Sequence, residues 1–200
     1  MKIKITLTVI ILLMIGLLIY VIMMPSNLNN QEQMKTLDEV ALTGELKQEE
    51  IIEEENDKLV TKEYTASDGK TYEIVAVLYI PTLEIEYPVF SSTSTELLKV
   101  SLNKYWGPNP NKVGNFCIIG HNYNDDRFFG KLHNIEIGHF IHLTDMTGKT
   151  LQYKVYDTYT VDPSDTSCTS QLTDGNKEIT LITCTKDFKQ RFIVKARETY

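Results

Sequence analysis

The sequence predicts an all-β fold in which short strands close, or nearly close, into a barrel. From Thr65 onward, apolar and β-branched residues recur in short alternating runs, which is the period of a half-buried strand. Glycine, asparagine, aspartate and proline separate these runs, and this part of the chain shows no long amphipathic helical pattern. Seven or eight short strands are typical of a barrel, because closure leaves no exposed sheet edge.

Each predicted element has a local signal. The turn Ser67-Asp68-Gly69-Lys70 opens the first strand, and the loop Gly107-Pro108-Asn109-Pro110 precedes the third. Helical turns are expected at Ser94–Leu102, where leucines form one apolar side, and at Phe128–Leu132. The expected strands are Thr71–Ile80, Leu83–Phe90, Gly114–Gly120, Gly138–Leu143, Leu151–Val161, Glu178–Thr183 and Phe192–Ala196.

The first 25 residues predict a transmembrane anchor. Ile5–Met24 is a run of twenty residues without a charge, and at about 1.5 Å per helical residue such a run spans roughly 30 Å of hydrocarbon. Lys2 and Lys4 precede it, which predicts a single pass with a cytoplasmic N-terminus and an extracellular body. The alternative is a cleaved signal peptide, but the run is too long for one and lacks a small-residue cleavage site.

Residues 26–65 predict an acidic, partly helical spacer between this anchor and a β-domain at 66–200. Residues 31–57 hold ten acidic residues and two lysines, so this segment alone carries more negative charge than the whole chain, whose net charge is −7. The β-domain is therefore close to neutral. It has no basic stripe, which excludes nucleic acid as an expected partner.

Three cysteines, Cys117, Cys168 and Cys184, indicate a reactive thiol rather than a disulfide scaffold. An odd number leaves at least one thiol unpaired, and the domain is large enough to bury its own core. Cys117 lies within an apolar strand and is expected to be a small buried hydrophobic residue. A bond between Cys117 and Cys168 is the disfavoured alternative.

Cys184 has the surroundings of a nucleophile. It ends an apolar strand, Glu178–Thr183, and Arg191 opens the next strand seven residues later. His121 follows another apolar strand in the run Gly120-His121-Asn122. A thiol needs a base to become a nucleophile, a leaving amine needs a proton, and an oxyanion needs a donor. These three side chains could supply all of these functions in acyl transfer.

At these residues the chain resembles the sortases, membrane-anchored cysteine transpeptidases of Gram-positive bacteria. Thr180-Leu181-Ile182-Thr183-Cys184 matches their Thr-Leu-x-Thr-Cys signature, Gly120-His121 is similar to their histidine motif, and Arg191 resembles the arginine of their last strand. The resemblance covers about residues 70–197. It implies an eight-stranded sortase-type barrel in which His121, Cys184 and Arg191 are catalytic, while Thr183 and Asn122 contribute to substrate binding.

The resemblance also implies a reaction. Cys184 would cleave a Leu-Pro-x-Thr-Gly-like sorting signal of surface proteins between threonine and glycine and form a thioacyl-enzyme. An amine of the cell wall or of a pilin would then resolve this intermediate. Some features, such as Asn122 after His121, are similar to class B sortases. The short connection before Glu178 favours a housekeeping or class D-like enzyme.

Two other functions fit the same residues. A cysteine hydrolase or protease would pass the acyl group to water, and a non-enzymatic membrane-anchored β-domain would bind a surface ligand. A metal site is not expected: His133 is nearby in the sequence, but the spacing of His139 and His142 puts these two on opposite faces of a strand. No cofactor is predicted; calcium occurs in some sortases, but Asp125 and Asp126 are too few acids to hold it.

Overall fold

The computed structural model describes residues 58–199, and the fold below is that of this part of the chain. The predicted anchor and most of the predicted acidic spacer lie outside the described residues. Within residues 58–199, no helix has the length and apolar character that a membrane crossing requires.

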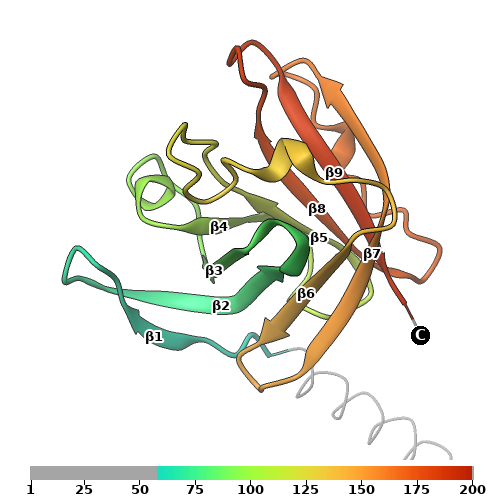
Figure 1. The fold of residues 1–200 in the computed structure, drawn as a ribbon. Coiled ribbons are helices and arrows are strands. Elements are labelled where there is room, and N and C mark those ends of the chain that lie inside the picture. The colour runs from blue at the N-terminus through green and yellow to red at the C-terminus, as the bar shows by residue number, and fades with distance from the viewer. Residues whose placement is uncertain (1–57, 200) are drawn as a thin grey trace, which may run out of the picture. The chain divides into compact units, whose positions relative to one another are not determined.

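Nine strands form one mixed sheet, with both antiparallel and parallel pairings, and eight of them close into a barrel (Figure 1). The sheet order is β1-β2-β3-β4-β5-β8-β9-β7-β6, and a further pairing between β2 and β6 closes it. Strand β1 pairs with the first half of β2. Strand β6 pairs with the second half of β2. The strands are β1 (Lys62–Thr65), β2 (Thr71–Ile80), β3 (Ile85–Phe90), β4 (Leu102–Trp106), β5 (Gly114–Ile119), β6 (Phe140–Asp145), β7 (Thr150–Val161), β8 (Lys177–Cys184) and β9 (Arg191–Glu198).

The closed eight-stranded barrel and the seven predicted strands are confirmed, and the sequence prediction missed β1 and β4. β4 follows the short 3-10 helix η2 (Leu97–Lys99), which fills only part of the predicted helical turn. It pairs with its neighbours in the chain, parallel to β3 and antiparallel to β5. Only Leu102 and Asn103 of its five residues are buried, so its own pattern carries little strand signal.

The inside of the barrel is filled by the inward-pointing apolar side chains of all eight strands. In β8, Ile179 and Leu181 point inward and are fully buried. Burying one such side chain contributes about 1.5–3 kcal/mol relative to leaving it exposed. Other members of this core are Val75, Leu78, Ile80, Val89, Leu102, Phe116, Ile118, Phe129, Ile141, Leu143 and Val194.

The outer face of β5, β8 and β9 is also covered. The connection between β7 and β8, residues 162–176, contains the 3-10 helix η4 (Ser167–Thr169). Its Cys168 packs in a second cluster with Cys117, Ile182 and Ile193. Six consecutive residues of β8 are therefore buried, because this strand has protein on both faces.

Candidate active site

The pairing of β8 with β9 brings Cys184 and Arg191 together. They are opposite residues in the antiparallel register, where paired side chains lie on the same face. Arg191 Nη1 donates to Cys184 Sγ over 3.1 Å. Both side chains are only partly buried. The structure thus places a guanidinium against a thiol at an accessible strand end.

His121 belongs to the same end of the sheet. β5 and β8 are parallel, with Ile119 beside Ile182, and the ladder continues as Gly120 N donates to the carbonyl of Ile182 over 3.1 Å. If the same register is continued by two residues, the backbone of His121 aligns with that of Cys184. Its imidazole contacts the ring of Tyr123, with centroids 5.3 Å apart. The three predicted catalytic residues thus come from three adjacent strand ends.

Gly120 is required for this arrangement. A Cβ atom at this position would lie 2.5 Å from Leu102 Cδ2 and 2.9 Å from Phe129 Cδ2. Any side chain here would push β5 away from the buried side chains beneath it. The glycine that precedes His121 therefore lets the backbone pass close to the core.

Thr183 and Asn122 bind backbone carbonyl groups near the site. Thr183 Oγ1 is buried and donates to the carbonyl of Gly120 over 2.7 Å. Asn122 Nδ2 donates to the carbonyl of Cys184 over 2.9 Å. Each bond joins the β5 end to the β8 end. Both side chains hold the strand that carries the thiol, a contribution that the motif alone did not reveal.

Burial and charge lower the pKa of His121. Desolvation is the larger cause, and the nearby ammonium of Lys99 on η2 is the second. Both disfavour the imidazolium, because one removes its hydration and the other adds a like charge. Lys99 has no motif around it, and the sequence analysis gave it no role.

The other two cysteines have different surroundings from Cys184. All three are free thiols. Cys117 is fully buried, and burial raises its pKa to about 12. Cys168 is 5% exposed, and burial raises its pKa as well. Only a thiolate is a good nucleophile, so burial makes both unsuitable, whereas Cys184 is accessible and contacts a cation.

A groove of about 190 Å³ leads to Arg191 along the outer face of the sheet. Its floor is apolar and includes Ile119, Ile182 and Ile193. Tyr105 of β4 also lines the groove, and the β7–β8 connection, with Thr166 and Cys168, forms a wall. The sequence analysis did not identify Tyr105, because β4 itself was not predicted.

The histidines outside the site are separate from one another. His133 stacks on Phe192, with ring centroids 4.7 Å apart. His139 Nδ1 lies 3.2 Å from Thr82 Oγ1, and the ring of His142 lies near Tyr79. Across residues 58–199, no group of three or more His, Cys, Asp or Glu side chains could hold a metal ion.

A closed β-barrel with a thiol in contact with a guanidinium at one strand end, and an imidazole at the end of the adjacent strand, defines a candidate cysteine acyl-transfer protein. The sortase domain model matches residues 78–199, which is more than half of the chain. The chain belongs to the sortase family, a family of cysteine transpeptidases.

Solved structures give the same fold. Sortase A from Corynebacterium diphtheriae is 27% identical with a TM-score of 0.60, over 64% of this chain and 62% of that one. A Clostridium perfringens Sortase D5 transpeptidase is 24% identical with a TM-score of 0.59, over 76% of this chain and 89% of that one. Sortase C-1 from Actinomyces oris is 23% identical with a TM-score of 0.58, over 62% of this chain and 71% of that one. No curated protein sequence matched the chain.

Proposed function

We propose that the chain is a membrane-anchored sortase transpeptidase that cleaves a Leu-Pro-x-Thr-Gly-like sorting signal between threonine and glycine. The observation that carries this proposal is the 3.1 Å contact between Arg191 Nη1 and Cys184 Sγ in a chain of the sortase family. A guanidinium at this distance stabilises negative charge on sulfur, and the thiolate is the form that attacks a carbonyl carbon.

The first half of the reaction forms a thioester. The reaction begins from the form that pairs a Cys184 thiolate with a His121 imidazolium. Cys184 Sγ attacks the threonine carbonyl carbon, an electron pair moves onto the carbonyl oxygen, and Arg191 stabilises that oxyanion. Collapse of the intermediate breaks the carbon–nitrogen bond, while His121 donates a proton to the departing glycine amine. The lowered pKa of His121 makes its imidazolium a stronger acid for this step.

The second half transfers the acyl group. An amine from a peptidoglycan cross-bridge or a pilin lysine attacks the thioester carbonyl, and neutral His121 accepts its proton. Cys184 leaves as the thiolate, which Arg191 again stabilises. Thr183 and Asn122 keep the β8 end in place through their bonds to the carbonyls of Gly120 and Cys184. No step in this sequence uses a metal or an organic cofactor.

The groove beside Arg191 provides room for the part of the signal that precedes the scissile bond. Its floor of Ile119, Ile182 and Ile193 suits apolar side chains such as leucine and proline. Arg191 lines the groove and also contacts Cys184, so a peptide lying in the groove would present its threonine carbonyl to the sulfur. The class D-like or housekeeping subclass stays a prediction that a library of sorting peptides would test.

Mass spectrometry of peptide products tests the proposal. A Leu-Pro-x-Thr-Gly peptide is incubated with the full-length protein, with and without triglycine. We expect a product joined at threonine to triglycine, and no product from Cys184→Ala. Hydrolysis alone at every triglycine concentration would support the cysteine hydrolase instead. Binding of the peptide without any cleavage would support the non-enzymatic domain, and cleavage by Cys184→Ala would remove Cys184 from the mechanism.

A further inference from the structure

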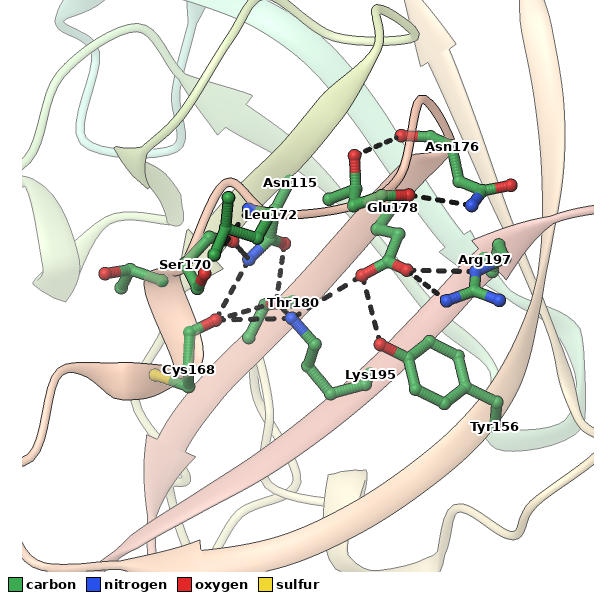
Figure 2. A network of polar contacts seen from close by, with 12 residues as sticks. Asn115, Tyr156, Cys168, Ser170, Leu172, Asn176, Glu178, Thr180, Lys195 and Arg197 are labelled. Atoms are coloured by element: carbon green, nitrogen blue, oxygen red, sulfur yellow. Dashed lines mark hydrogen bonds and ion pairs between the residues drawn. The ribbon is translucent and has the colours of Figure 1, made fainter.

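A polar network on the outer face of the sheet holds the β7–β8 connection, and this connection is one wall of the groove (Figure 2). Paired residues of β5, β8 and β9 share this face in successive rows. One row is Asn115, Glu178 and Arg197, and the next is Cys117, Thr180 and Lys195. A row of three isoleucines follows, and then the row with Cys184 and Arg191. The network and the reactive thiol therefore share one face.

Lys195 brings a nearly buried ammonium to the centre of the network. Its side chain is 12% exposed. Nζ donates to Thr180 Oγ1 over 2.9 Å and to the carbonyl of Cys168 over 3.3 Å, and lies 3.8 Å from Glu178 Oε2. Burying an ammonium is unfavourable unless such partners compensate for its lost hydration. One of the three partners, Cys168, belongs to the groove wall.

Asn115 holds the same segment from β5. Its Nδ2 donates to the carbonyls of Cys168 and Ser170 over 2.9 and 3.1 Å. Its Oδ1 accepts a hydrogen bond of 2.6 Å from Thr180 Oγ1. Gln171 adds bonds to the Asn115 backbone N–H and carbonyl over 2.9 and 3.0 Å. The Cys168 carbonyl thus accepts hydrogen bonds from Asn115 of β5 and Lys195 of β9. Thr180 of β8 lies between these two donors and is hydrogen-bonded to both side chains.

Glu178 balances the charge in the network. Its side chain is 6% exposed and accepts hydrogen bonds from Arg197 Nη2 and Nε over 2.6 and 2.9 Å and from Tyr156 O–H over 3.0 Å. Figure 2 shows this carboxylate between Arg197 and Lys195. The acid therefore fixes the position of Lys195 on the sheet, and Lys195 in turn reaches the connection.

The network lies too far from Cys184 to take part in the chemistry. Lys195 and Arg191 are four residues apart on β9, which corresponds to roughly 13 Å along a strand at about 3.3 Å per residue. Any influence of Lys195 on the reaction must therefore pass through the wall that it holds.

We propose that Lys195 is a positioning residue for substrate binding. Its ammonium, together with Asn115 and Thr180, fixes the Cys168 carbonyl and so holds the β7–β8 connection as a groove wall before the peptide arrives. This inference rests on the proposed function, because it takes the groove as the site of the sorting signal. A preformed wall spares the peptide the cost of ordering a loop as it binds.

The test combines peptide kinetics with thiol labelling of Lys195→Met, which removes the ammonium and keeps most of the apolar stem. In the full-length protein we expect KM for the sorting peptide to rise about tenfold or more while kcat stays within about twofold, the signature of an interaction lost equally from the bound peptide and from the transition state. In the Cys184→Ala background we expect a maleimide to label Cys168 faster, because the wall that contains this 5% exposed thiol loosens. Lys177→Met is the matched control, since Lys177 pairs with Glu198 away from the groove.

A second variant provides the test if Lys195→Met does not fold. Thr180→Val has nearly the same shape and charge, and it removes the hydroxyl between Asn115 and Lys195; we expect the same two changes in smaller measure. Unchanged KM together with unchanged Cys168 labelling would overturn the inference, as would a loss confined to kcat. If the wild-type protein cleaves no sorting peptide, the proposed function fails, and Cys168 labelling alone then decides whether Lys195 holds the wall.

Discussion

Removing the guanidinium of Arg191 should reduce peptide cleavage by about 10²–10³-fold. At the observed distance of 3.1 Å, two unit charges attract by about 5 kcal/mol at an effective dielectric constant of about 20. The partly buried position and the lost hydration of both groups reduce the net value. Loss of a single oxyanion donor costs about 2.7–4 kcal/mol in comparable sites, which corresponds to the expected factor.

The assay is steady-state cleavage of a Leu-Pro-x-Thr-Gly peptide by Arg191→Met, with Arg191→Lys and Lys189→Met as companions. The loss should fall on kcat, because charge on the carbonyl oxygen develops only in the transition state. Arg191→Lys should recover part of the activity, since it keeps the charge but not the planar fork. Lys189→Met, an exposed lysine in the same β8–β9 turn, should retain full activity. A kcat for Arg191→Met within threefold of the parent would refute the reasoning.

Three further predictions concern the surroundings of the site. Thr183→Val should lower the free energy of unfolding by about 1–3 kcal/mol in urea denaturation, because the buried carbonyl of Gly120 loses its donor; equal stability of this variant and Thr183→Ser would contradict this. Lys99→Met should raise the pKa of His121 but leave it below its ordinary value, because burial is the larger cause of the lowering. The imidazolium would then persist to higher pH in an NMR titration of the ring, and an unshifted titration would show that Lys99 has no influence. Chelation by EDTA or addition of calcium should change peptide cleavage by less than about twofold, since residues 58–199 contain no group of three or more His, Cys, Asp or Glu side chains that could hold the ion; a larger response would reveal a metal site.

The sequence was most informative where neighbouring strands are also neighbours in the chain. β8 and β9 form a hairpin with only six residues between Cys184 and Arg191, so this short separation was enough to predict that the two side chains lie close together. The alternating patterns of β2, β3 and β5 to β9 likewise reflect local geometry, because residues two apart share a face of a strand. His121 was identified by its motif, and its place beside Cys184 depends on a pairing that its neighbours in the chain do not reveal.

What the sequence determined by itself was the family, the strands with clear alternation, and which of the three cysteines has a cation within reach. The tertiary structure decided the rest through the parallel pairing of β5 with β8, whose partners lie 63 residues apart. That pairing directs Thr183 and Asn122 to backbone carbonyls and places Asn115 and Lys195 under the groove wall. Local periodicity tells which residues share a strand face but not which strands become neighbours. These contacts therefore appear only once the tertiary structure pairs β5 with β8.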